Sequence, residues 1–396
     1  TFKWHMTHDW CQNPNGTCTP SSHTHMSSSI LLPSQTFSQW RRKSCFLLMS
    51  MLLCAVIWVP VSRGENSSPL PERESPSSSN NNNILIPIAG YLPDYRSVNL
   101  NQTIPFLSDL ILFSLEVHSR GMVGGCCLRK DHYERARIAK RSKNPNLNLW
   151  VTVGGQGRAN GWQSVCQDAT KRTRFIESMI RLCTREGIQG IDLDWFSSIR
   201  TLQDRLDFLE FLTIASPLWH EQGIRLSIPL HVGQVLPEWA YALVDRIHLM
   251  VYDSSPQSMT TPAGKRHSIE QGRIEHAKKG VDYLVQSKCP PHKIWMGIPF
   301  FASRLDTPGV TKTFYEAVKE SGTKETSLEN LEPLLAGFQF DSIGVIRAKW
   351  TLVQERGLGG VFIWELGQDG PSGNFLEGVV NVGRATAVSS DSKEEL

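Results

Sequence analysis

Eight short apolar runs, rich in β-branched residues, limit the folds that this chain can adopt. They cover residues 84–91, 109–117, 147–155, 188–195, 224–231, 246–253, 293–301 and 359–366. Between several of them lie stretches with the apolar spacing of one helix face, at residues 168–187, 205–219 and 341–357. Strands that alternate with helices pair in parallel through helical crossovers.

Eight such units predict an α/β fold of the (β/α)8 class, a TIM barrel, over residues 84–384. A doubly wound open sheet is the alternative, but the segment "AGYLPDYR" after the first run holds a single glycine and no phosphate-binding loop. Residues 305–358 leave room for a helix or two. We therefore expect no sizeable insertion domain.

The segment before the barrel differs in composition. Residues 1–44 are polar and aperiodic, and are expected to be a disordered leader or an extension of the gene model. A basic run precedes the apolar residues 45–61, and Ser62-Arg63-Gly64 follows, which predicts a secretory signal peptide over 45–64. A signal anchor in the membrane is the alternative, because the length is marginal for a span. Residues 65–83 form a Ser/Pro/Asn-rich linker.

Other local patterns agree with the secretory pathway. Asn66-Ser67-Ser68 and Asn101-Gln102-Thr103 are sequons for N-glycosylation. The ending "SKEEL", within a flexible tail over 385–396, resembles an endoplasmic-reticulum retrieval signal; a solvated acidic terminus is the alternative. We expect an extracellular or lumenal protein.

Charge and cysteine usage exclude some classes of partner. The net charge is +3 and the basic residues are scattered, so no nucleic-acid partner is expected. The barrel segment holds five cysteines, in a spacing that fits no zinc site: Cys126, Cys127, Cys166, Cys183 and Cys289. We expect no metal and no cofactor, with buried free thiols or at most two disulfides.

A barrel gathers the carboxyl ends of its strands at one face, where its chemistry lies. The runs end in polar and aromatic residues, namely Tyr91, Gly154, Gly155, Asp192, Asp194, Tyr252, Asp253, Trp364 and Glu365. Asp192 and Asp194 alternate with Ile191 and Leu193, so both carboxylates point to one face of their strand. Two like charges near a core are costly unless something nearby uses them.

These strand ends resemble the motifs of glycoside hydrolase family 18, the chitinases and chitinase-like proteins. "QGIDLDWF" (189–196) overlays the family's D-G-x-D-x-D-x-E, "TVGG" (152–155) its S-x-G-G and "MVYD" (250–253) its M-x-Y-D. The segments "KIWMGIPFFASR" and "LGGVFIWELGQD" match its last two strands. The resemblance extends from about residue 84 to about residue 383, in the family's order.

The resemblance implies substrate-assisted hydrolysis, in which the sugar's own N-acetyl oxygen attacks the anomeric carbon. It implies that Asp194 orients the acetamido group and that Asp192 is its buried partner. Tyr252 and Asp253 become the contacts to the acetamido group and the sugar. Trp364 becomes the floor beneath the ring, and Tyr91 is expected to form a wall.

The resemblance also has a gap. The position of the family's catalytic glutamate holds Phe196, which cannot donate a proton, and Gln189 replaces the first aspartate of the motif. Five other residues could act as the acid. Glu365 is expected to point away from the mouth, and the hydroxyls of Ser197 and Ser198 are too weakly acidic. Glu116 and His118, at the end of the second strand, remain as candidates. Restoring the carboxylate with Phe196→Glu is expected to recover part of the activity.

The sequence thus favours a catalytically silent, chitinase-like protein that binds N-acetylglucosamine-containing glycans, with Phe196 as an added apolar wall. An active hydrolase that uses another acid is the first alternative. A structural or partner-binding barrel, its mouth filled by Trp195 and Phe196, is the second. A divalent metal on Asp192 and Asp194 ranks last because a third ligand is lacking.

Overall fold

The computed structural model describes residues 86–124, 128–252, 266–304, 307, 309–322, 331–370 and 373–391. The predicted leader, signal segment and linker, the sequon at Asn66, the residues Asp253, Cys126 and Cys127, and the "SKEEL" ending lie outside the described residues. Within the described ranges, no helix combines the length and apolar character that a membrane span requires.

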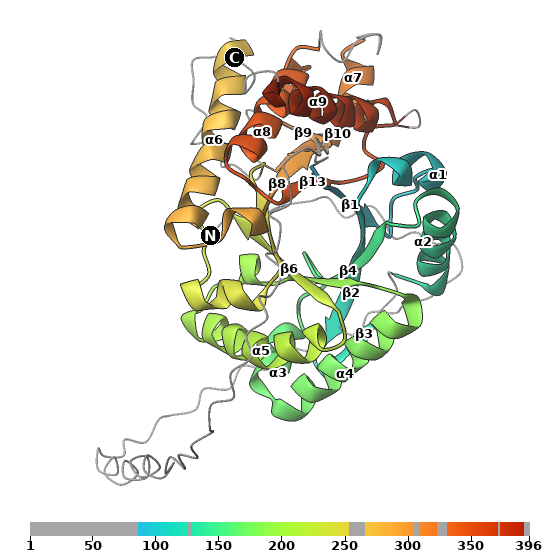
Figure 1. Cartoon of the computed structure of the whole chain (residues 1–396), viewed down its shortest axis with the longest axis vertical. Helices are drawn as coiled ribbons and strands as arrows, with labels where there is room; N and C mark the ends of the chain where they lie inside the picture. The colour runs from blue at the N-terminus through green and yellow to red at the C-terminus, as the bar shows by residue number, and fades with distance from the viewer. Residues whose placement is uncertain are drawn as a thin grey trace, which may run out of the picture. The chain divides into compact units, whose positions relative to one another are not determined.

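Eight parallel strands close into a barrel, as the sequence predicts (Figure 1). Neighbours in the sheet follow the order β1-β13-β8-β7-β6-β5-β4-β2, and pairing of β1 with β2 closes the ring. The strands are β1 (Ile88–Pro93), β2 (Asp109–His118), β4 (Asn148–Gly154), β5 (Gly190–Asp194), β6 (Arg225–His231), β7 (Arg246–Met250), β8 (Ile294–Pro299) and β13 (Gly360–Trp364). All eight predicted runs are therefore strands, although several end a few residues earlier than predicted.

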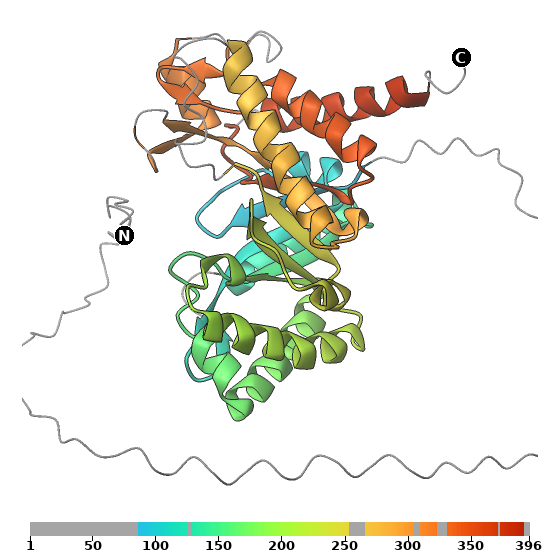
Figure 2. The same ribbon diagram turned by 90° about the vertical axis from the view of Figure 1, so that its left-hand side faces the viewer.

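Helices surround the barrel and cover the outer face of its strands (Figures 1 and 2). The α-helices are α1 (Leu100–Thr103), α2 (Lys130–Lys143), α3 (Trp162–Gln167), α4 (Ala169–Glu186), α5 (Leu202–His220), α6 (Arg266–Gln286), α7 (Phe314–Glu320), α8 (Ile343–Glu355) and α9 (Asn374–Asp391). Short 3-10 helices are η1 (Ile104–Phe106), η2 (Phe196–Ser198), η3 (Glu238–Leu243) and η5 (Pro291–Lys293). The three predicted helical stretches correspond to α4, α5 and α8.

Helix α4 illustrates how local sequence sets these boundaries. The Asp168 side chain accepts a hydrogen bond from the Lys171 backbone N–H and caps the first turn. Gly187 ends the helix in the left-handed conformation, which glycine adopts without steric cost. The predicted apolar face is buried, with Phe175 and Met179 fully covered.

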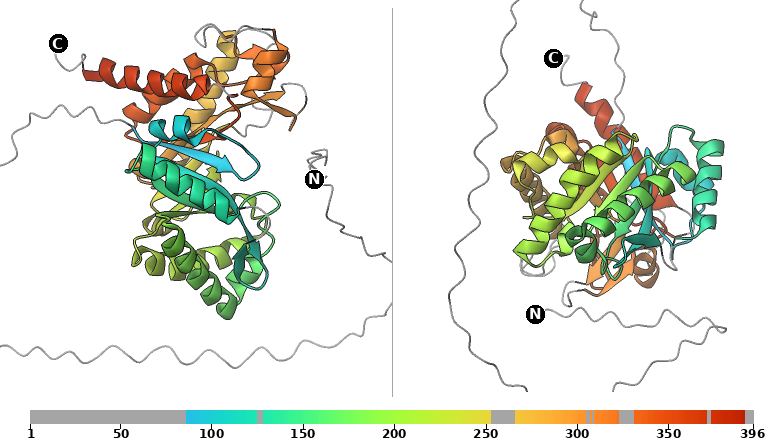
Figure 3. Two further views of the ribbon diagram at one scale, coloured as in Figure 1. Left: turned by 90° about the vertical axis from the view of Figure 1, so that its right-hand side faces the viewer. Right: turned by 90° about the horizontal axis from the view of Figure 1, so that it is seen from below.

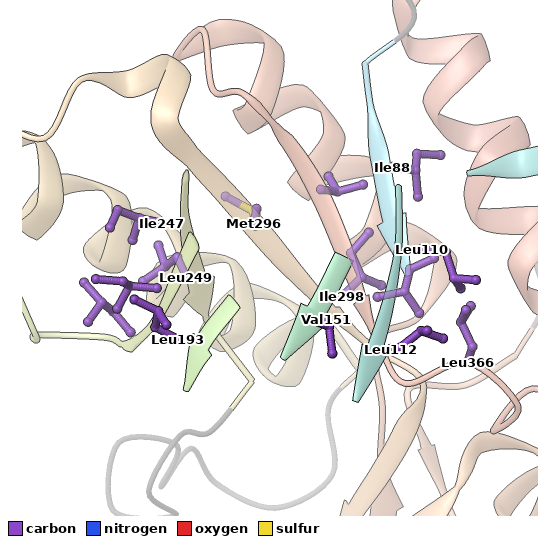
Figure 4. Close-up of a cluster of buried hydrophobic side chains, with 14 of the residues drawn as sticks. Ile88, Leu110, Leu112, Val151, Leu193, Ile247, Leu249, Met296, Ile298 and Leu366 are labelled. Atoms are coloured by element: carbon purple, nitrogen blue, oxygen red, sulfur yellow. The ribbon is translucent and has the colours of Figure 1, made fainter. Parts of the chain in front are cut away.

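Two hydrophobic clusters lie on opposite faces of the strands. The larger one fills the layer between strands and helices and includes Ile88, Leu110, Leu112, Leu193, Ile298 and Leu366 (Figure 4). The smaller one consists mainly of strand residues that alternate along the chain with those of the larger cluster. Its members are Ala89, Tyr91, Ile111, Phe113, Trp150, Tyr252, Trp295 and Phe362. These residues come from strands on opposite sides of the ring, so the smaller cluster is the barrel interior.

A small antiparallel sheet was not predicted. Strands β9 (Phe301–Arg304), β10 (Thr311–Thr313), β11 (Leu334–Leu335) and β12 (Phe338–Gln339) form a sheet of order β10-β9-β12-β11 between the last two barrel strands. A further strand, β3 (Met122–Gly124), pairs with the end of β2. Strands of two to four residues show no usable periodicity, so the sequence indicated only helices in residues 305–358.

Candidate functional site

The carboxylate of Asp192 is fully buried in the barrel and is satisfied by hydrogen bonds from neighbouring strands. Strand register places Thr152 on one side of Asp192 and Ser227 on the other. The Thr152 hydroxyl donates to Asp192 Oδ2 at 2.9 Å, and the Ser227 hydroxyl donates to Oδ1 at 2.6 Å. A buried carboxylate requires such partners, so Asp192 is held in one position.

Tyr91 and His248 complete this network from β1 and β7. The Tyr91 hydroxyl donates to Asp192 Oδ2 at 3.1 Å and lies 2.5 Å from His248 Nδ1. The direction of the Tyr91–His248 hydrogen bond depends on the tautomer of the His248 ring. Burial, followed by the nearby charge of Asp192, raises the pKa of Tyr91 well above its ordinary value, so the phenol stays protonated.

Asp194 lies further along β5, nearer to the mouth, and is half-buried. The Ser197 hydroxyl donates to Asp194 Oδ1 at 3.5 Å. Gly155 lies against this carboxylate with a φ of +88°, and a Cβ there would be 3.2 Å from Asp194 Oδ2 and 2.5 Å from Phe113 Cζ. The glycine pair of "TVGG" therefore allows the end of β4 to approach Asp194 closely.

Aromatic rings surround the two carboxylates. The Trp364 ring is half-buried and meets Tyr91 at 5.3 Å and Phe113 at 4.9 Å between centroids, both edge-to-face. Tyr252 is almost buried and packs edge-to-face on Phe301 at 5.7 Å. Trp364 and Asp194 are thus the partly exposed members of the group, and both could contact a ligand at the carboxyl end of the barrel.

Phe196 does not join these rings. Its side chain is 2% exposed and belongs to the cluster between strands and helices. Its ring lies 5.8 Å from that of Phe208 on α5, and the Arg205 guanidinium lies 5.4 Å from its centroid. Trp195 packs in the same layer, stacked on Trp162 at 5.8 Å. Neither ring fills the mouth of the barrel. The sequence instead predicts Phe196 as an apolar wall of the sugar site or, in the alternative of a structural barrel, both rings as the filling of the mouth.

The carboxylate of Glu365 is buried and directed toward the segment after β1. It accepts hydrogen bonds from Arg96 Nε at 2.6 Å, the Tyr95 hydroxyl at 2.8 Å and Gln368 Nε2 at 3.0 Å. This arrangement agrees with the expectation that Glu365 points away from the mouth.

The remaining candidate acids lie on the extension of β2 that pairs with β3, where Glu116 is opposite Gly124 and His118 is opposite Met122. Both side chains are half-buried. In the described part of the chain, no group of three or more His, Cys, Asp or Glu residues is placed to hold a metal ion. Cys166, Cys183 and Cys289 are buried free thiols.

The structure brings together five of the predicted site residues: Tyr91, Asp192, Asp194, Tyr252 and Trp364. Sequence reasoning did not identify Ser227 and His248 as members of the network. A signal for both is present, because each is a polar residue with apolar residues on either side of it in a strand. A strand buried on both faces is normally continuous in apolar residues, so such an exception indicates a polar partner in the interior.

Comparison with known proteins identifies the family. The sequence model of "Glycosyl hydrolases family 18" matches residues 88–369. An endochitinase of Brugia malayi is 24% identical over 276 residues, which cover 58% of this chain and 55% of that protein. The chain spans about half the length of the first curated relatives that it matches.

Solved structures share the fold. A mutant class V chitinase of Nicotiana tobaccum, in complex with NAG4, superposes with a TM-score of 0.61 at 18% identity, covering 76% of this chain and 99% of that one. A class V chitinase mutant of Cycas revoluta, in complex with (GlcNAc)3, gives a TM-score of 0.60 at 18% identity, covering 74% of this chain and 99% of that one. Because the family's sequence pattern spans the barrel from β1 to the segment after β13, this chain belongs to glycosyl hydrolase family 18.

Proposed function

We propose that this chain binds N-acetylglucosamine-containing oligosaccharides at the carboxyl end of its barrel without hydrolysing them at the rate of a chitinase. The observation that carries the proposal is the contrast between two neighbouring positions of β5 and η2. Asp194 is half-buried beside the aromatic rings, whereas Phe196 is turned into the layer against α5. Asp194 and the rings beside it support sugar binding, whereas position 196 has no carboxylic acid for proton transfer.

The binding part of the proposal rests on Trp364. Its ring is held by edge contacts to Tyr91 and Phe113 and is half-buried. Sugar rings present a face of C–H groups that packs on an indole, while nearby polar groups fix the orientation. Asp194 and Tyr252 supply polar groups for that second role. The relatives crystallised with NAG4 and (GlcNAc)3 support this class of ligand.

The silent part rests on proton transfer. In the family mechanism the departing sugar oxygen needs a proton, and without it an alkoxide must leave. Phe196 has no proton to donate. Glu365, which follows Trp364, is a candidate acid, but its carboxylate is paired with Arg96. Ser197 is a hydroxyl and too weak an acid for this step.

Replacing Trp364 with alanine is expected to weaken binding of chitotetraose by about 1–3 kcal/mol, as loss of an aromatic hot spot does. Isothermal titration calorimetry at millimolar ligand measures this loss. Trp239→Ala is the matched control, because this tryptophan is 52% exposed on η3. The control should bind as the native chain does. If the native chain shows no heat of binding, or if both variants bind like it, the sugar-binding proposal is wrong.

A further inference from the structure

A polar cavity lies outside the ring of strands, next to the carboxyl ends of the neighbouring strands β1 and β13. It has a volume of about 340 Å³, within the range of ligand sites. The segment after β1, including α1 and η1, forms one wall, and residues from 366–370 and 373–377 form the other. In Figure 3, α1 (light blue) lies beside α9 (red).

The lining of this cavity indicates the chemistry that it would accept. Asn99, Asn101 and Thr103 contribute amides and a hydroxyl, and Phe106 contributes an apolar ring. The acidic residues Asp369 and Glu377 also line it, and no lysine or arginine does among the described residues. Such a site disfavours anions and suits a neutral ligand with hydroxyl and amide groups on an apolar ring face.

One lining residue is also the acceptor of a sequon. Asn101-Gln102-Thr103 lies on α1, and Asn101 is exposed at the rim of the cavity. It is the sole Asn-x-Ser/Thr triplet in the described ranges. The Thr103 hydroxyl donates to the Asn99 carbonyl at 3.1 Å, beside the same four-residue helix. The modification site and the cavity therefore share one surface element.

We propose that Asn101 carries an N-linked glycan and that the first sugars of this glycan occupy the cavity. In the transfer step, Asn101 Nδ2 forms a bond to C1 of the reducing-end sugar of a lipid-linked oligosaccharyl diphosphate. The C1–O bond to the diphosphate breaks, the lipid diphosphate leaves, and one amide proton passes to solvent. No group is oxidised or reduced. The proposal depends on entry into the secretory pathway and is independent of the sugar site at the barrel mouth.

Attachment compensates for weak affinity. A sugar tethered at the rim experiences an effective concentration in the millimolar range, so a few contacts suffice to hold it in the cavity. Gly367 allows the two walls to approach each other closely, because its φ is +88° and a Cβ there would lie 2.9 Å from Val98 Cγ1. An attached N-acetylglucosamine would present its acetamido group and hydroxyls to the amides of the α1 wall.

The first test uses Thr103→Ala, which destroys the sequon, and Thr103→Ser, which preserves it. The full chain is produced in a eukaryotic secretory host, and the peptide that contains Asn101 is analysed by mass spectrometry before and after treatment with peptide N-glycosidase. Native and Thr103→Ser chains should carry the glycan, and Thr103→Ala should not. An unmodified Asn101 in the secreted native chain would overturn the proposal.

The second test asks where the glycan lies. Hydrogen exchange is compared between the glycosylated Thr103→Ser and the unglycosylated Thr103→Ala chains. Backbone amides of residues 97–106, 366–370 and 373–377 should exchange faster without the glycan, while those of β5 should not change. Native chain treated with the glycosidase should behave like Thr103→Ala. Equal exchange at both segments despite full glycosylation would show that the cavity does not hold the sugar.

Discussion

Purified protein is expected to hydrolyse chitotetraose at least about 10²–10⁴-fold more slowly than a family 18 chitinase that retains its acid, since a positioned general acid contributes about that factor. A release assay with chitotetraose or a fluorogenic chitobioside measures the difference. Turnover at the level of an ordinary chitinase, abolished by Asp194→Asn, would show that another group donates the proton.

The environment of Phe196 also predicts what Phe196→Glu will do. The sequence alone predicts partial recovery of activity, but the ring lies against Phe208 and beneath Arg205. A glutamate there would pair with the Arg205 guanidinium, which lowers the pKa of a carboxyl and holds it ionised. A general acid must instead be protonated near neutral pH. We therefore expect little recovery from the single change.

Adding Arg205→Gln to Phe196→Glu removes the pairing charge and is expected to raise turnover above that of the single variant. Phe196→Gln is the matched control, because it loses the same packing and has no acid. Circular dichroism establishes that each variant is folded. Chitinase-like turnover by Phe196→Glu alone would contradict the packing argument and would show that this side chain reaches the scissile bond.

Asp341→Asn is expected to lower the free energy of unfolding by about 3–5 kcal/mol, because it leaves two buried cations without their anion. Asp341 Oδ1 lies 2.5 Å from Arg273 Nε, and Oδ2 lies 2.6 Å from Lys349 Nζ, with all three side chains buried. Lys349 Nζ also donates to the Gly297 carbonyl on β8 at 2.9 Å. This group therefore links α6, α8 and the barrel.

Urea denaturation, monitored by circular dichroism, measures the loss in free energy of unfolding. The matched comparison is the double variant that carries both Asp341→Asn and Lys349→Met. Removing one cation together with the anion should recover part of the stability, because one unpaired charge then remains instead of two. A loss below about 1 kcal/mol from Asp341→Asn would be typical of an exposed pair and would contradict this account.

The effect of Asp341→Asn should also depend on pH. Burial alone would raise the pKa of Asp341, but the charges of Arg273 and Lys349 outweigh it, so the pKa lies below its ordinary value. A carboxyl with a depressed pKa in the folded state contributes its stability above the unfolded value, about 3.9, and loses it as the pH falls through the folded pKa. The difference in free energy of unfolding between the native and Asp341→Asn chains should therefore be largest near pH 7 and should shrink below about pH 4.

Much of the barrel could be predicted because its signals are local. Runs such as 109–117 and 224–231 became β2 and β6 almost residue for residue, since a short apolar run is a property of consecutive residues. The two ends of α4, at Asp168 and Gly187, are likewise set by the residues at those positions. The five predicted site residues that the structure describes also converge, because a closed parallel barrel brings the ends of all its strands to one face.

Other features depend on residues that are distant in sequence. Tyr91, Thr152, Ser227 and His248 meet Asp192 only because the strands pair in one register. The side of the sheet that Phe196 occupies is decided after β5 ends, where strand alternation no longer applies and contacts with α5 take over. The cavity at Asn101 likewise exists only where α1 meets α9. A sequence pattern records which face a residue prefers, whereas the partner on that face is determined by packing of the whole chain.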